Sequence, residues 1–216
     1  MIKYVQGGDS MNYYVDFDNT LYETAKLTSL EMEEITKTIC EEKKLDFDKT
    51  FEEVKSSFDS PKGNFILFAK DMAKKYNANE EKLLNKVNYI IDNSKDLVYE
   101  DAKRFLKRLR EKGNKIVILT YIVNGNQAQQ MQKLMGSGIS SDVDEIFITT
   151  ELKYTLDLDY SKGIFIDDAP RDLTGLYEKN PIKVIRIRKP NNKRSKVDID
   201  NKDIEEYVSF DDIEII

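Results

Sequence analysis

The stretch that decides the fold lies near the amino terminus and reads Tyr13-Tyr14-Val15-Asp16-Phe17-Asp18-Asn19-Thr20-Leu21. Its first three residues form a short apolar run, which ends at one aspartate and is followed two positions later by a second. Continuous apolar runs of this length are typical of strands that are buried on both faces of a parallel sheet. The stretch therefore predicts a buried strand that delivers two carboxylates at its carboxyl end.

Four more apolar runs follow this strand along the chain. They cover residues 116–119, ending at Thr120; 146–148, ending at Thr149; 164–166, ending at Asp167; and 184–187. We expect the first four of the five runs to be buried on both faces, and we predict helices over residues 102–109 and 127–135 and a last short strand over 207–210. The alternation of strands and helices predicts an α/β fold, with a Rossmann-like parallel sheet core flanked by helices.

The stretch 23–95 interrupts this alternation. It contains about four amphipathic helical segments in succession and no convincing strand, with a loop at residues 60–64 in the middle. We interpret it as an inserted all-helical domain. The predicted organisation is a core formed by residues 1–22 and 96–216 and an inserted domain formed by residues 23–95.

The composition excludes several kinds of active site. The sequence contains no histidine and a single cysteine, Cys40, so a Ser-His-Asp triad, a Cys-His pair and a histidine-rich zinc site are ruled out. A single thiol also allows no intrachain disulfide, and we expect a cytoplasmic protein. Any chemistry must come from carboxylates, lysine, hydroxyl groups and a metal that prefers oxygen ligands.

The charge argues against two classes of partner. The formal net charge is −6, which repels nucleic acid and anionic lipid, and no segment approaches the roughly 18 apolar residues of a membrane span. We therefore expect neither a nucleic-acid nor a membrane partner. One local basic stretch is interpreted as a solvated loop; it contains Lys183, Arg186, Arg188, Lys189, Lys193, Arg194 and Lys196.

Polar residues gather where the predicted strands end, which is the edge at which parallel sheets bind ligands. Besides those that close the apolar runs, the candidates are Asp18, Thr20, Lys153, Asp168 and Asp172. Several carboxylates at one edge repel one another, and a divalent cation removes that repulsion. With oxygen ligands alone, the expected ion is Mg²⁺, shared with a substrate phosphate.

These residues resemble the four motifs of the haloacid dehalogenase (HAD) superfamily of aspartate-nucleophile phosphotransferases, in the family's order. Residues 16–21 are similar to the first motif, Asp-x-Asp-x-Thr after an apolar strand, and residues 119–120 to the second. Lys153 is placed like the third motif, and residues 164–172 are similar to the fourth in its Asp-Asp form. The resemblance spans about residues 12–188, and it implies that the inserted helices form a C1-type cap.

The resemblance implies a role for each site residue. Asp16 would attack phosphorus to form an aspartyl-phosphate, and Asp18 would act as the general acid and base. The side chains of Asp16 and Asp168 and the backbone carbonyl of Asp18 would hold Mg²⁺. Thr120 and Lys153 would bind the phosphoryl oxygens, and the supporting residues would be Thr20, Asp167 and Asp172.

The resemblance thus predicts a magnesium-dependent phosphatase acting on a small phosphate monoester, such as a nucleotide, a sugar phosphate or a phospho-acid. Asp18 favours phosphorus over carbon chemistry, because dehalogenases of the family lack an acid at that position. A phosphomutase, a non-catalytic protein and a phospho-accepting signalling domain remain alternatives. Lys162 is the alternative phosphate-binding lysine, and the protein could be a monomer or a homodimer.

Overall fold

The computed structural model describes residues 10–58, 64–123, 126–160, 163–179 and 182–216, in two compact units. The sheet unit consists of Met1–Leu21, Tyr99–Tyr121 and Ser141–Ile216, and the helical unit of Tyr22–Val98 and Ile122–Ser140. In the described residues, no helix is long and apolar enough to cross a membrane.

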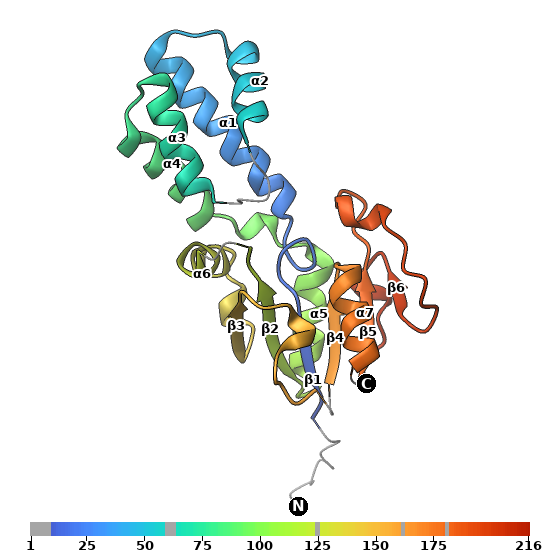
Figure 1. Ribbon diagram of the computed structural model, residues 1–216. Coiled ribbons are helices and arrows are strands. Elements are labelled where there is room, and N and C mark those ends of the chain that lie inside the picture. Colours follow the sequence, from blue (N-terminus) through green and yellow to red (C-terminus); the bar gives the residue numbers. More distant parts are fainter. Residues whose placement is uncertain (1–9, 59–63, 124–125, 161–162, 180–181) are drawn as a thin grey trace, which may run out of the picture. The chain divides into compact units, whose positions relative to one another are not determined.

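The sheet unit is built on six strands in the order β3-β2-β1-β4-β5-β6, and each neighbouring pair is parallel (Figure 1). The strands are β1 (Asn12–Val15), β2 (Lys115–Tyr121), β3 (Glu145–Thr149), β4 (Gly163–Asp167), β5 (Lys183–Ile187) and β6 (Glu205–Tyr207). Helix α5 (Glu100–Glu111) packs against β2, and α7 (Pro170–Lys179) packs against β4 and β5. The predicted α/β fold with a parallel sheet core is confirmed.

The first strand has a buried residue on each face of the sheet, because successive side chains point to opposite faces. Tyr14 belongs to a core cluster with Phe165 and Leu176, and its hydroxyl donates to the carbonyl of Asp159. The ring of Tyr13 meets that of Phe105 edge to face, with centroids 6.0 Å apart. Both faces of β1 are therefore packed, which fixes the direction in which Asp16 leaves the strand.

Two expectations about strands were wrong in detail. The strand β3 is not buried on both faces: it lies at the edge of the sheet, and Phe147 is 40% exposed. The last strand, β6, spans Glu205–Tyr207, whereas Phe210 begins a short 3-10 helix. An apolar run does not reveal whether a strand is central or at an edge, since that depends on the strand order.

The helical unit contains α1 (Thr24–Lys43), α2 (Phe47–Ser57), α3 (Phe65–Tyr76), α4 (Glu80–Asp92) and α6 (Gln127–Gly136). Four of these begin with a side-chain cap, and the capping residues are Asp46, Asn64, Asn79 and Asn126. Most of the predicted loop at residues 60–64 lies outside the described residues, which resume at Asn64.

Helix α6 belongs to the helical unit, whereas the division predicted from the sequence included this segment in the sheet core. It belongs to the helical unit because it packs closely on α4. The side-chain amide of Gln132 donates to Asn88 at 3.2 Å and to Asp92 at 3.0 Å. A β-carbon on Gly136 would lie 2.0 Å from the carbonyl oxygen of Ile91, so only glycine allows the two helices to approach this closely.

The helical unit also buries an acid, Glu31 of α1. Its side chain is almost fully covered, and Oε1 has no hydrogen-bond partner among the described residues. Burial raises the pKa of Glu31 to about 8, and the charge of Lys133 offsets only part of that rise. Because the pKa of Glu31 is higher in the folded state than in the unfolded state, protonation of Glu31 favours the folded state. This contribution to stability is fully present below the unfolded-state pKa and is lost as the pH rises through about 8.

We therefore expect Glu31→Gln to flatten the pH dependence of stability. Between pH 5 and pH 9 the parent should lose roughly 4 kcal/mol of unfolding free energy that the variant retains. Urea denaturation at a series of pH values measures this difference. Glu34→Gln, on the same helix in an ion pair with Lys86, is the control and should follow the parent; a Glu31→Gln curve parallel to the parent's would contradict the expectation.

Candidate active site

The site begins with a tight turn immediately after β1. The backbone N–H of Asp16 still donates to the carbonyl of Ile166 on β4, at 2.9 Å, so Asp16 is held at the end of the sheet. Asn19 has a φ of 61°, a left-handed conformation that asparagine tolerates better than most residues. The turn brings Thr20 back over the strand end, where its hydroxyl donates to Oδ2 of Asp16 at 3.1 Å.

Lys153 reaches the same carboxylate from the segment that follows β3. Its side chain is 2% exposed, and Nζ donates to Oδ1 of Asp16 at 2.5 Å and to Oδ2 of Asp167 at 2.7 Å. The hydroxyl of Tyr160 donates to the backbone carbonyl of Lys153 at 3.2 Å. The lysine predicted from the third motif is thus placed between two of the predicted acids, while Lys162 lies outside the described residues.

Two aspartates at the end of β4 complete an acidic cluster. Oδ1 of Asp167 accepts from the backbone N–H of Ala169 at 2.8 Å, which orients this carboxylate towards Lys153. Asp16, Asp167 and Asp168 each offer an oxygen, and these oxygens lie within 4.8 Å of one another. All three side chains are buried. We refer to these three residues as the acidic cluster.

The acidic cluster contains more negative charge than its neighbouring cations can neutralise. Burial raises the pKa of Asp16 well above its ordinary value, against the attraction of Lys153. Burial and the neighbouring Asp167 raise the pKa of Asp168 to about 6. For Lys153, burial alone would lower the pKa, but the carboxylates of Asp16 and Asp167 reverse this, so the ammonium stays charged.

The acidic cluster suits a hard divalent cation. Its donors are carboxylate oxygens, the ligands that Mg²⁺ prefers, and histidine is absent from the chain. A bound cation would also reverse the cause of the raised carboxyl pKa values, which is burial of negative charge with too few positive partners. Asp167 is placed as a member of this group, whereas the resemblance gave it a supporting role.

The other predicted residues occupy the same edge of the sheet in different ways. Thr120 is fully buried, two positions beyond Ile118, which pairs with Val15 in the register of β1 and β2. Asp18 is half-buried and stands outside the acidic cluster. Asp172 lies in the first turn of α7; it is buried, and its Oδ1 has no hydrogen-bond partner among the described residues.

Lys193 and Lys196 of the basic stretch are exposed, but its interpretation as a solvated loop was wrong for Arg186, Lys189 and Arg194. Arg186 lies on β5 and is fully buried, and its guanidinium donates to Glu206. Lys189 is buried and pairs with Asp101. Arg194 pairs with Asp168 of the acidic cluster. The available signal was the position of Arg186 inside an apolar strand, where an arginine must find partners for its charge.

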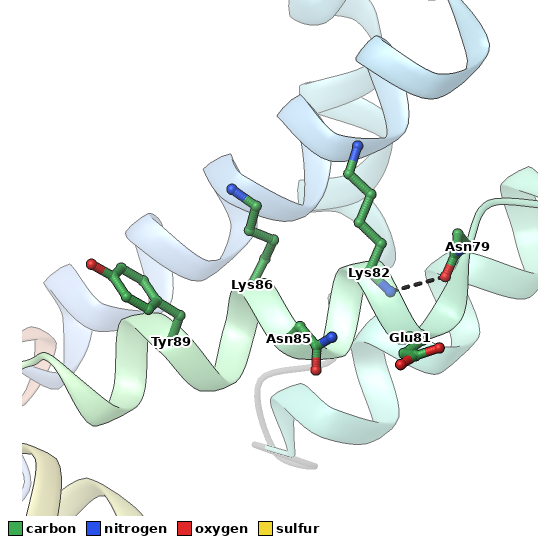
Figure 2. Close-up of a pocket in the computed structure, with 6 residues that line it drawn as sticks. All are labelled: Asn79, Glu81, Lys82, Asn85, Lys86 and Tyr89. Carbon is green, nitrogen blue, oxygen red and sulfur yellow. Dashed lines mark hydrogen bonds between the residues drawn. The ribbon is translucent and has the colours of Figure 1, made fainter.

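A shallow hollow of about 590 Å³ runs along the outer surface of the helical unit (Figure 2). It is lined by Asn79, Glu81, Lys82, Asn85, Lys86 and Tyr89, all on or beside α4. Lys82, Lys86 and Tyr89 project from this one helix in Figure 2. The hollow contains no member of the acidic cluster, so the candidate active site is assigned to the cluster.

The parallel sheet thus carries an aspartate after its first strand, a buried lysine after its third and two aspartates at the end of its fourth. A family model described as haloacid dehalogenase-like hydrolase matches residues 14–176. The chain belongs to this family, which confirms the resemblance at the level of the superfamily. A search of curated proteins finds no match.

Solved structures of the same fold have low sequence identity to this chain. A haloacid dehalogenase-like hydrolase from Burkholderia xenovorans has a TM-score of 0.69 and 16% identity, over 94% of both chains. A HAD phosphatase from Thermococcus onnurineus has a TM-score of 0.56 and 16% identity, over 93% of this chain and 91% of that one. A 2-haloacid dehalogenase from Pseudomonas syringae has a TM-score of 0.58 and 12% identity, over 93% and 95%.

Proposed function

We propose that the protein is a magnesium-dependent phosphatase that hydrolyses a small phosphate monoester through an aspartyl-phosphate. The observation that carries this proposal is the arrangement around Asp16. One oxygen of its carboxylate is held by Lys153 and the other by Thr20, inside a cluster of oxygen donors. A nucleophile for phosphorus needs this fixed orientation together with positive charge for the phosphoryl oxygens.

The reaction divides into two displacements at phosphorus. An oxygen of Asp16 forms a bond to phosphorus while the bond to the leaving oxygen breaks, and Asp18 gives that oxygen its proton. Asp18 then takes a proton from water, whose oxygen attacks phosphorus and releases Asp16 and inorganic phosphate. Lys153 and Thr120 would hold the phosphoryl oxygens, while Asp172 and Thr20 support the acids.

The acidic cluster and the backbone carbonyl of Asp18 would hold the metal. When bound, a magnesium ion neutralises negative charge on the carboxylates and on the phosphoryl group. The proposed substrate is a small phosphorylated metabolite, such as a nucleotide, a sugar phosphate or a phospho-acid. The single cysteine, Cys40, supports action in a reducing compartment such as the cytoplasm.

Dehalogenation is the main competing reaction within the family, since it also uses an aspartate nucleophile. Asp18 favours phosphatase chemistry, because the leaving oxygen of a phosphate ester needs a proton and a departing halide does not. A phosphomutase or a non-catalytic protein could retain the same residues. A phospho-accepting signalling domain fits less well. In such domains the acidic pair follows the first strand and the lysine comes last along the chain, whereas here the acidic pair, Asp167 and Asp168, comes after Lys153.

Turnover of p-nitrophenyl phosphate by the purified protein tests the proposal. We expect hydrolysis with Mg²⁺ and a loss of at least about 100-fold in rate with EDTA, because the phosphoryl charge would lose its main counter-charge. Release of chloride from 2-chloropropionate is measured in parallel. Chloride release without phosphate release would identify a dehalogenase, and no turnover of either compound would contradict the phosphatase proposal.

A further inference from the structure

The segment that follows β5 reaches back to the acidic cluster. Nδ2 of Asn192 donates to Oδ2 of Asp168 at 2.5 Å, and Nη1 of Arg194 donates to Oδ1 of the same carboxylate at 2.9 Å. The Asp168 side chain is fully buried, whereas that of Arg194 is 49% exposed. Arg194 therefore extends from the solvent to the carboxylate of Asp168. Among the described residues, no other positively charged side chain lies within hydrogen-bond distance of this carboxylate.

The position of this segment is fixed by two arginines of the sheet unit. The buried guanidinium of Arg186 donates to the backbone carbonyl of Arg194 at 2.7 Å and to that of Val197 at 2.6 Å. Arg188 donates to the backbone carbonyl of Ser195 at 2.5 Å through Nη2 and at 3.1 Å through Nε. Hydrogen bonds from charged donors are strong, so the fold itself holds the segment against the acidic cluster.

The balance of charge around Asp168 determines how Arg194 affects the binding of a metal ion. The acidic cluster carries three negative charges when it is ionised, and the cations that contact it in the described residues are Lys153 and Arg194. These two cations leave one net negative charge. A divalent cation is attracted by that charge and repelled by the nearby guanidinium.

We propose that Arg194 is an internal counter-cation that competes with the metal ion for Asp168. In the metal-free protein Arg194 pairs with Asp168 and holds its carboxylate in place. It weakens metal binding because its charge has the same sign as that of the incoming ion. Asn192 holds the other oxygen of Asp168 without any charge, so it orients the ligand and favours metal binding. Both are positioning residues, and the inference rests on the metal site of the proposed function.

The two neighbours should therefore change metal affinity in opposite directions. Titration of the purified protein with Mn²⁺ or Mg²⁺, without substrate and followed by calorimetry, measures the affinity directly. We expect Arg194→Gln to bind the metal about tenfold more tightly, and Asn192→Ala to bind it about threefold to tenfold more weakly. Arg194→Lys, which retains the charge, should remain close to the parent.

The matched control is Arg104→Gln, which removes the same charge from an exposed ion pair with Asp211 elsewhere in the sheet unit. Its metal affinity should stay within about twofold of the parent, because exposed charges are screened beyond roughly 10 Å. Thermal melting of each variant shows that it is folded.

Equal or weaker metal binding by Arg194→Gln, in a parent that binds metal, would overturn the role of Arg194 and leave the proposed function intact. A shift of Arg194→Gln and Asn192→Ala in the same direction would also overturn it, because loosening of the segment then explains both. Absence of metal binding in both the parent and Arg194→Gln would overturn the metal dependence of the proposed function, and this inference with it.

Discussion

Replacing Asp16 by Asn is expected to reduce phosphatase turnover by at least about 10³-fold, the largest effect of any single substitution in this protein. An amide is a far weaker nucleophile than a carboxylate, and the aspartyl-phosphate could not form. The neighbouring geometry should persist, because Lys153 keeps its ion pair with Asp167. Steady-state hydrolysis of p-nitrophenyl phosphate, together with trapping of the phosphorylated protein by acid quench, measures both consequences.

The same substitution should not destabilise the metal-free protein. Asp16→Asn removes one of three negative charges that are buried close together, so it relieves repulsion at the cost of one ion pair. The control is Asp157→Asn, at an exposed position, which should keep full activity. Activity of Asp16→Asn within tenfold of the parent would show that Asp16 is not the nucleophile.

Replacing Lys153 by Ala is expected to affect both activity and stability. Loss of its charge leaves the buried carboxylates of Asp16 and Asp167 without their shared partner, and breaking a buried ion pair in this way costs about 3–5 kcal/mol. Turnover should fall by about 10²–10³-fold, the range for loss of one group that stabilises charge in the transition state. Urea denaturation and p-nitrophenyl phosphate hydrolysis measure the two effects.

A surface lysine gives the comparison for this variant. Lys183 forms an ion pair with Glu205 at 2.9 Å, and both side chains are exposed by a third or more. Lys183→Ala should change the unfolding free energy by no more than about 1 kcal/mol. If Lys153→Ala were as stable and as active as Lys183→Ala, the acidic cluster would not depend on this lysine.

The sequence allowed the fold and the acidic cluster to be predicted because both depend on local patterns. Continuous apolar runs identify buried strands, and the residue after each run lies at the edge where ligands bind. Asp16 and Asp167 were found in this way, without knowledge of which strands are neighbours. Lys153 was preferred to Lys162 because it follows the third run, whereas Lys162 directly precedes the fourth run and is expected at the opposite edge of the sheet.

Features that depend on the path of the chain could not be predicted in the same way. Arg194 meets Asp168 across 26 residues, and this contact depends on how Arg186 and Arg188 fold the segment after β5. The edge position of β3 depends on the strand order, and the assignment of α6 to the helical unit depends on its contact with α4. A pattern within a few residues carries no information about any of these three.

The central position of β1 in the sheet has a consequence for how the protein acquires its activity. Tyr13 pairs with Ile116 and Ile164, and Asp16 meets Lys153 across 137 residues. Contacts between residues so far apart in the chain form slowly, since long loops must close first. During synthesis, neither β2 nor β4 exists until more than half of the chain has been made, so β1 cannot pair before then. Recovery of activity during refolding should therefore report the last steps of sheet assembly, after the helical unit has gained its secondary structure.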